Sequence, residues 1–173
     1  MEKNQTHLEK QKTRNDLTGE HKVGDIGQLT LACLFLVVWI ADTFFFRYTT
    51  FLNIYVPNGI RVFLGLLILI ISGYLAKTGH SIVFGEIREK PTVIRKNVFS
   101  IVRHPIYLGE ILLYIGLLIL SISLAAVIVF FAVFIFLYYI SKYEERLLLE
   151  RFGEEYKEYM QDVPMLIPRL LKR

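Results

Sequence analysis

The sequence predicts an all-α, polytopic membrane protein. We expect four transmembrane helices, the last two forming a helical hairpin, followed by a cytoplasmic C-terminal helix. Apolar residues make up 54% of the 173 residues, mean hydropathy is +0.45, and the apolar residues are concentrated in blocks long enough to cross a bilayer. The 20 lysines and arginines flank these blocks. This pattern excludes an ordinary globular enzyme and favours membrane topology over nucleic-acid binding as the reason for the basic balance.

The chain divides into a tail and one membrane domain. Residues 1–25 are polar, mixed in charge and without helical periodicity, which predicts a flexible tail, and residues 26–173 form the domain. The first apolar block, near 26–46, starts too late for a signal peptide and is not followed by a small-residue cleavage site, so we expect it to be retained. The second helix is expected near 60–76.

The apolar run 106–140 is too long for one helix across about 30 Å of hydrocarbon at about 1.5 Å per residue. Two helices, 106–121 and 124–141, joined at Ser121-Ile122-Ser123, fit better than a single overlong tilted helix. In the C-terminal segment 142–173, apolar residues recur at helical spacing, which predicts that the last helix continues into the cytosol.

Loop charges set the expected orientation. Basic residues concentrate between the second and third helices and after the fourth, whereas the hairpin tip carries none. Because basic residues are retained in the cytoplasm, both termini and the long loop are expected there. Small residues recur seven apart on the second helix (Gly65, Ser72) and the third (Gly109, Gly116), which favours close helix packing.

Two polar clusters are the candidates for chemistry. The first, Arg103-His104-Pro105-Ile106-Tyr107-Leu108-Gly109-Glu110, lies where the cytoplasmic loop enters the third helix. Pro105 suits the first helical turn. The exposed N–H groups of that turn, with Arg103 and His104, suit an anionic group, and Gly109 allows close approach. The alternative is a collar of interfacial residues at the headgroups.

The second cluster, Glu144 and Glu145, lies where the fourth helix leaves the membrane. The alternative here is an ordinary solvated face. The predicted topology brings both clusters to one side of the membrane, so a pocket with basic donors and two acids would match a zwitterionic ligand with a ribose diol.

The sequence resembles the isoprenylcysteine carboxyl methyltransferase family, whose members are integral membrane enzymes that use S-adenosylmethionine. The family pattern reads R-H-P-x-Y-x-G, then E-E-x-x-L, then F-G-x-x-Y-x-x-Y and Val-Pro with a further Pro. The resemblance covers roughly residues 60–168. The matching residues are Arg103, His104, Pro105, Tyr107, Gly109, Glu144, Glu145, Leu147, Phe152, Gly153, Tyr156, Tyr159, Val163, Pro164 and Pro168.

The resemblance implies a cofactor pocket at the cytoplasmic face. Glu144 would hold the ribose hydroxyls or the ammonium group of the cofactor. Arg103 and Glu145 are the candidate catalytic residues, with Glu145 as a partner of Arg103 or Lys142. The other candidate cofactor-binding residues are Thr92, Val93, Ile94, Phe99, His104, Pro105, Ile106, Tyr107 and Gly109.

The chain departs from the family pattern at three places. Asn97-Val98-Phe99 stands where relatives have Gly-x-Tyr, and asparagine is the non-glycine residue best suited to a positive φ there. Pro91 replaces a histidine. Ile140 replaces an arginine that precedes the acid pair in relatives, and this bears on how a substrate carboxylate would be held.

The implied activity is methyl transfer, most like carboxyl O-methylation of a protein S-isoprenylcysteine. The acceptor would be a lipophilic small molecule or lipidated substrate that enters from the bilayer. An ionised carboxylate needs no general base, whereas a hydroxyl would need Glu145, Glu110 or His104. The alternatives are another lipid methyltransferase (for a phospholipid amine, a quinone or an alkylpyrone), an NADPH-dependent reductase and a scaffold. The four histidines lack metal-ligand spacing, and the single cysteine, Cys33, excludes a cysteine metal cluster.

Overall fold

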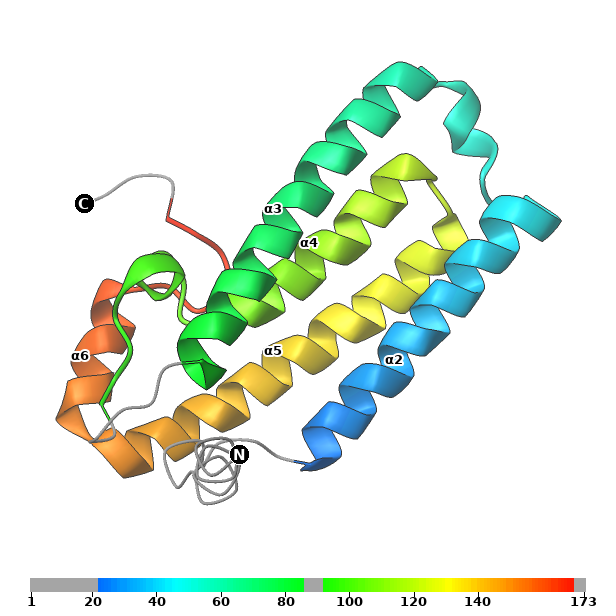
Figure 1. Ribbon diagram of the computed structural model, residues 1–173. Helices are drawn as coiled ribbons and strands as arrows, with labels where there is room; N and C mark the ends of the chain where they lie inside the picture. Colours follow the sequence, from blue (N-terminus) through cyan, green and yellow to red (C-terminus); the bar gives the residue numbers. More distant parts are fainter. Residues whose placement is uncertain (1–21, 86–91, 170–173) are drawn as a thin grey trace, which may run out of the picture.

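The computed structural model describes residues 22–85 and 92–169, and this part of the chain is helical and has no strand. Its five α-helices are shown in Figure 1. They are α2 (Lys22–Ile40), α3 (Asn58–Phe84), α4 (Pro105–Leu120), α5 (Leu124–Phe152) and α6 (Glu154–Asp162). Helix α2 continues into a π-helical turn, Ala41–Phe46.

The predicted tail falls mostly outside the described residues, but its last four residues are helical. Helix α2 begins at Lys22, not at Ile26, so the predicted boundary was wrong by one turn. Asp25 lies in the first turn of the helix, where a carboxylate interacts favourably with the helix dipole. The change from polar to apolar residues therefore located where the apolar stretch begins, and the helix itself begins one turn earlier.

Helices α2 to α5 run alternately up and down, as Figure 1 shows. Helix α4 packs mainly against α3, and α5 packs mainly against α2. The α3–α4 pair follows the small-residue spacing: Gly65 and Gly116 face each other, and the Ser72 hydroxyl donates to the Gly109 carbonyl at 2.7 Å. The predicted joint between α4 and α5 is present. The backbone of α4 nevertheless lies closest to α3 and not to α5, its partner in the hairpin.

The joint between α4 and α5 follows the serines. Helix α4 ends at Leu120 and α5 begins at Leu124. Ser123 is the N-cap of α5, and its hydroxyl accepts from the Ala126 N–H at 3.2 Å. A serine N-cap satisfies a backbone donor that has no partner inside the helix, which explains why α5 begins here.

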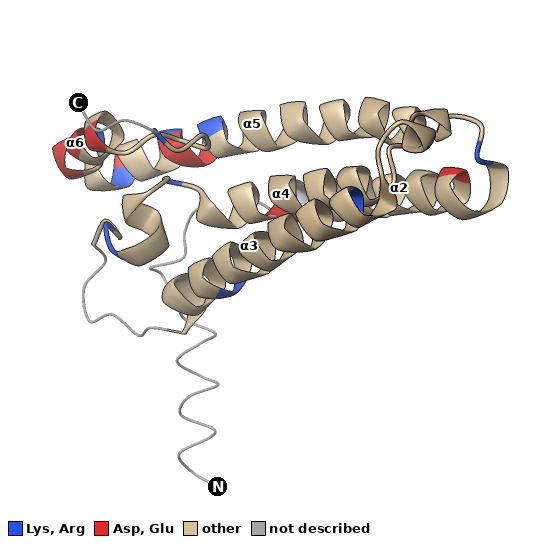
Figure 2. Cartoon of the chain, turned by 90° about the horizontal axis from the view of Figure 1, so that it is seen from above, with Lys and Arg blue, Asp and Glu red and all other residues tan. Residues whose placement is uncertain are grey.

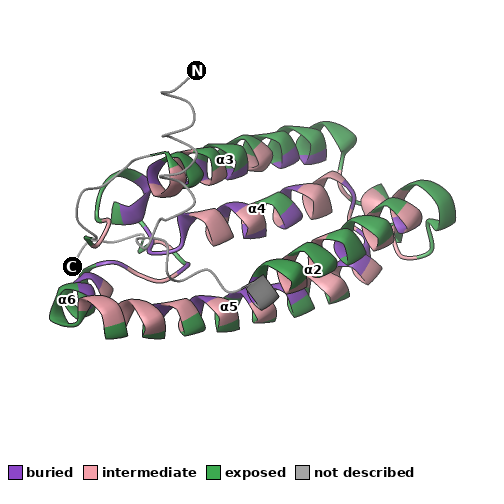
Figure 3. Ribbon diagram, turned by 60° about the horizontal axis from the view of Figure 1, so that its bottom comes forward, coloured by how far each residue is buried: buried purple, intermediate pink, exposed green. Residues whose placement is uncertain are grey.

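Among the described residues, three helical segments are long and apolar enough to cross a membrane: Gly24–Phe46, Asn58–Phe84 and Leu124–Phe152. Helix α4 has 16 residues, or about 24 Å at 1.5 Å per residue, which is shorter than the hydrocarbon core. The four-span count and the cytoplasmic termini therefore remain predictions. Many large apolar side chains on these helices are exposed (Figure 3), as expected of lipid-facing surface.

Two helices extend beyond the predicted spans. Helix α3, expected to end near residue 76, continues to Phe84 because the polar residues that follow Ala76 end the apolar run without breaking the helix. Helix α5 continues to Phe152, which confirms the predicted continuation beyond the apolar span. In Figure 2, charged residues gather around α6 and the adjoining end of α5, whereas the middles of the long helices are largely uncharged.

The C-terminal segment is packed against the loop that precedes α4. Tyr156, Tyr159 and Val163 form a buried cluster under this segment. The backbone N–H of Arg103 donates to the Pro164 carbonyl at 2.9 Å, and that of His104 donates to the Met165 carbonyl at 3.1 Å. These two bonds fix the start of α4 from a segment 61 residues away in the chain.

Candidate functional site

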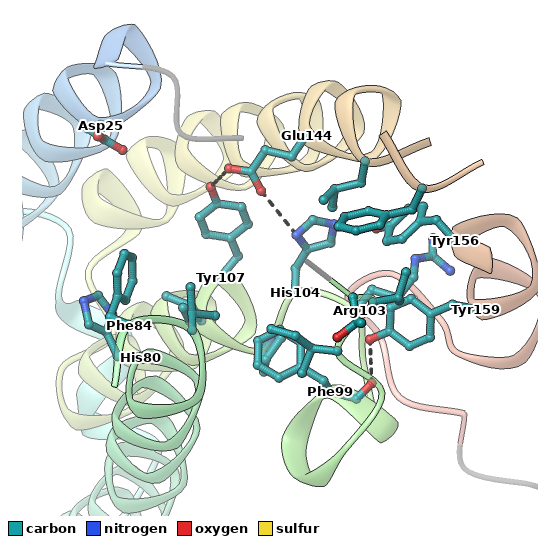
Figure 4. Close-up of a pocket in the computed structure, with 18 of the residues that line it drawn as sticks. Asp25, His80, Phe84, Phe99, Arg103, His104, Tyr107, Glu144, Tyr156 and Tyr159 are labelled. Atoms are coloured by element: carbon teal, nitrogen blue, oxygen red, sulfur yellow. Dashed lines mark hydrogen bonds and ion pairs between the residues drawn. The ribbon is translucent and has the colours of Figure 1, made fainter. Parts of the chain in front are cut away.

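A cavity of about 530 Å³ lies at the end of the bundle where α4 begins and α5 meets α6. Its size is that of a small-molecule site. Its walls come from α2, α3, the loop before α4, the start of α4, the end of α5 and α6 (Figure 4). The lining residues are Asp25, Gln28, His80, Val83, Phe84, Thr92, Val93, Ile94, Phe99, Arg103, His104, Pro105, Ile106, Tyr107, Glu144, Leu148, Phe152, Tyr156 and Tyr159.

The first turn of α4 places two of the polar groups in this wall. His104 is the N-cap residue and Pro105 is the first residue of the helix. Proline is favoured there because its missing N–H has no intrahelical partner to lose. His104 is buried, and its ring is stacked on that of Tyr107 with 5.6 Å between centroids and 9° between planes.

Glu144 of α5 joins these two side chains across the cavity. The Tyr107 hydroxyl donates to one carboxylate oxygen of Glu144, and the other oxygen lies 3.5 Å from His104 Nδ1. Figure 4 shows both contacts. The Glu144 side chain is 22% exposed, so its carboxylate is still accessible to a ligand in the cavity. Helices α4 and α5 therefore converge on one carboxylate here.

Arg103 and Glu145 form a buried ion pair behind that wall. Arg103 Nε and one terminal nitrogen lie 2.7 and 2.6 Å from Glu145 Oε1. The other terminal nitrogen donates to the backbone carbonyls of Met160, at 3.0 Å, and Val163. Both side chains of the pair are at least 93% buried. The pair ties α5 and the C-terminal segment to the loop before α4.

His104 carries an incomplete set of partners. Its Nε2 lies 3.5 Å from Glu145 Oε1 but forms no hydrogen bond, and Glu145 Oε2 also has none. Burial alone would lower the pKa of His104, but its close contacts with the negative carboxylates of Glu144 and Glu145 outweigh burial and raise this pKa above its ordinary value. The folded protein therefore favours the charged imidazolium.

The structure brings most of the sequence-predicted site residues to one place. Ten of them line the cavity: Thr92, Val93, Ile94, Phe99, Arg103, His104, Pro105, Ile106, Tyr107 and Glu144. Glu145 lies behind the wall and pairs with Arg103, one of the two partners expected for it. Gly109 lies elsewhere: it packs against α3, where an added Cβ would come within 3.1 Å of Ser72 O and Ala76 N.

The loop before α4 adopts the turn that the sequence predicts. Asn97 has a φ of +56°, in the left-handed region that glycine adopts most readily and asparagine more readily than most other residues. The 3-10 turn Asn97–Ser100 follows it and buries Phe99. The carbonyl of Phe99 accepts from the Tyr159 hydroxyl at 2.6 Å. Asparagine therefore preserves the approach of this loop to the cavity.

Sequence reasoning missed the part of the wall supplied by α2 and by the end of α3. Asp25 was assigned to the tail, and His80 and Phe84 lie beyond the predicted end of the second helix. The acidic residue in the first turn of α2 was a signal for an earlier helix start. Gln28 gives no such signal, because a single amide in an apolar run does not indicate what it faces.

The lining fits S-adenosylmethionine. His104 Nε2 is a buried polar atom without a hydrogen-bond partner, Glu144 offers a carboxylate to ribose hydroxyls or an ammonium group, and aromatic rings offer faces to an adenine. When bound, this cofactor supplies a methyl group activated by a sulfonium. The protein's part would then be to hold donor and acceptor in line and to exclude water, which in ideal cases is worth about 7–11 kcal/mol.

Comparison with known proteins gives the family. The model of the phospholipid methyltransferase family matches residues 54–155. Methanethiol S-methyltransferase 1 of Bradyrhizobium diazoefficiens is 40% identical over 72 residues, which are 41% of this chain and 24% of that protein, so the match spans about a quarter of the relative's length. No solved structure matches. The family match covers more than half of the chain, so this integral membrane protein belongs to the phospholipid methyltransferase family.

Proposed function

We propose that this protein transfers a methyl group from S-adenosylmethionine to a lipophilic acceptor at the boundary of the bilayer. The observation that carries the proposal is the cluster of Tyr107, Glu144 and His104 on the wall of a cavity of ligand size. The cavity lies where three long apolar helices end or begin, so a lipophilic acceptor has a route to it from the membrane.

Within this proposal the cofactor occupies the side of the cavity built by α4, α5 and the loop before α4. Glu144 would bind ribose hydroxyls or the ammonium group, because it is the carboxylate of that wall with an exposed face. His104 would keep the Glu144 carboxylate in position, because its Nδ1 lies 3.5 Å from Glu144 Oε2. Phe99, Tyr156 and Tyr159 would enclose the apolar part of the cofactor.

Two acceptor classes compete for the other side. Carboxyl O-methylation, implied by the resemblance to isoprenylcysteine carboxyl methyltransferases, needs a cation for the acceptor's carboxylate. Arg103 is buried in the described lining, and each of its three side-chain nitrogens already contacts Glu145 or a backbone carbonyl. The second buried base of that lining is His104, and its two ring nitrogens lie 3.5 Å from carboxylate oxygens of Glu144 and Glu145. These observations favour a second candidate, methylation of an amine, thiol or hydroxyl.

The test is calorimetric binding of S-adenosylhomocysteine and of NADPH to the detergent-purified protein. We expect saturable binding of S-adenosylhomocysteine, loss of that binding in His104→Ala and Glu144→Ala, and unchanged binding in Glu150→Ala, which removes an exposed carboxylate of the same helix. Binding of NADPH alone would instead indicate a reductase. Normal affinity in both cavity variants would refute the assignment of the site.

A further inference from the structure

Helix α2 supplies two polar side chains to the cavity from outside the part of the chain that matches the family. The family match begins at residue 54, whereas Asp25 and Gln28 lie on α2 and line the cavity. In Figure 4, Asp25 lies on the same side of the view as His80 and Phe84 of α3, whereas Tyr107 lies toward Glu144 and His104. This side of the cavity is therefore built from elements other than those of the proposed cofactor side.

A hydrogen-bonded chain fixes the orientation of Gln28. Its amide nitrogen donates to one oxygen of Glu110, and the other oxygen of Glu110 accepts from the Tyr114 hydroxyl at 2.6 Å. With the amide nitrogen donating to the Glu110 carboxylate, the carbonyl oxygen is the end of the amide left to accept a hydrogen bond from a ligand. Asp25 is exposed and offers only acceptor atoms when ionised.

Both α2 side chains thus present hydrogen-bond acceptors to whatever fills this side of the cavity. A ligand group that carries N–H, S–H or O–H donors would satisfy them, and a carboxylate would be repelled by Asp25. The two buried bases of the described lining, Arg103 and His104, already face the carboxylates of Glu145 and Glu144, so they do not offset that repulsion.

We propose that Asp25 and Gln28 are specificity-determining residues that bind the head group of the methyl acceptor and favour an amine, thiol or hydroxyl over a carboxylate. The inference rests on the proposed function, since it takes the opposite wall as the cofactor side. It assigns acceptor choice to a helix that the family match does not include.

The test uses four probes with one tail: octylamine, octanethiol, octan-1-ol and octanoate. Each is titrated calorimetrically into the full-length protein in detergent, with and without saturating S-adenosylhomocysteine, and into empty micelles. The variants are Asp25→Asn, Asp25→Lys and Gln28→Leu. Thr30→Val is the matched control, because Thr30 is exposed on the same helix, lies outside the cavity lining and bonds only within its helix.

We expect the wild type to bind octylamine more tightly than octanoate. Asp25→Asn should weaken octylamine about two- to fivefold, as for a solvent-exposed ion pair, and Asp25→Lys should invert the preference. Gln28→Leu should weaken the three donor-bearing probes about two- to tenfold, the worth of one hydrogen bond. Thr30→Val should match the wild type, and the affinity for S-adenosylhomocysteine should be unchanged throughout.

Two failures are distinguishable. If Asp25→Lys keeps the wild-type ratio of octylamine to octanoate affinity, the inference is overturned even when S-adenosylhomocysteine binds normally. If the wild type binds the probes selectively but does not bind S-adenosylhomocysteine, the proposed function fails while the head-group site stands. The inference would also be overturned if each probe bound the Asp25 and Gln28 variants with the same affinity as it binds Thr30→Val.

Discussion

The buried pair of Arg103 and Glu145 holds three distant segments together, and its removal tests how the site is assembled. In Arg103→Met, the Glu145 carboxylate keeps only more distant cations, with His104 Nε2 at 3.5 Å and Lys142 Nζ at 3.9 Å. The carbonyls of Met160 and Val163 also lose their donor. Breaking a buried pair from one side costs about 3–5 kcal/mol because it leaves an uncompensated charge.

The size of that cost decides the expected phenotype. Folded domains are stable by only about 5–15 kcal/mol, so Arg103→Met should unfold at markedly lower denaturant concentration. Glu145→Leu should cost less, because Arg103 keeps its two carbonyl acceptors. The double variant Arg103→Met/Glu145→Leu should be more stable than the sum of the single effects predicts, with a coupling energy of about 3 kcal/mol between two residues in direct contact.

The measurement is a double-mutant cycle of the free energy of unfolding in mild detergent, followed by circular dichroism. The matched control is the pair of Lys157 and Glu154, which are 2.9 Å apart but 57% and 80% exposed. An exposed pair should give a coupling energy of about 0–1 kcal/mol. If the coupling of Arg103 with Glu145 is no larger than that of the control pair, burial is not what gives the pair its effect, and the reasoning fails.

Three further outcomes follow from the structure. Gly109→Ala should lower the free energy of unfolding by about 1–3 kcal/mol without changing S-adenosylhomocysteine affinity, whereas Gly73→Ala, with nothing within 4 Å of its added Cβ, should not destabilise the protein. Tyr107→Phe should weaken S-adenosylhomocysteine binding about three- to tenfold in calorimetry, because Glu144 loses its donor. The raised pKa of His104 contributes stability that is full below about pH 6.5 and is lost as pH rises through the folded-state value; denaturant titrations from pH 6 to 9 should show this loss in the wild type and not in His104→Gln.

The sequence predicted the parts of the fold that depend on local chemistry. The apolar run was too long for one helix and was interrupted at Ser121–Ser123, so the joint was placed within one residue of the end of α4 and at the start of α5. Small residues marked the seam between α3 and α4, and Asn97 marked a left-handed turn. In the last two cases the side chain itself restricts the backbone or the approach of a neighbour.

The parts that it could not predict depend on what lies opposite in space. The fall in hydropathy predicted that the second helix ends near residue 76. A helix can continue beyond an apolar environment, and α3 extends to Phe84. Gly109 sits within the R-H-P-x-Y-x-G motif, yet only the position of α3 shows that its missing Cβ serves helix packing. Asp25 and Gln28 reach the cavity only because α2 lies beside α5.

The division of the bundle into two pairs also separates the two halves of the proposed reaction. Helix α4 is fixed against α3 through glycines, and its first turn is fixed by the C-terminal segment through Arg103 and two backbone bonds. The polar groups of the cofactor side are therefore held by buried, short-range contacts. Asp25 and Gln28 lie on the other pair of helices, α2 and α5. The Asp25 side chain is exposed, and that of Gln28 is half-buried. Since rigid elements position chemistry and exposed side chains tolerate exchange, we expect substitutions on α2 to change the preferred acceptor without disturbing the proposed cofactor wall.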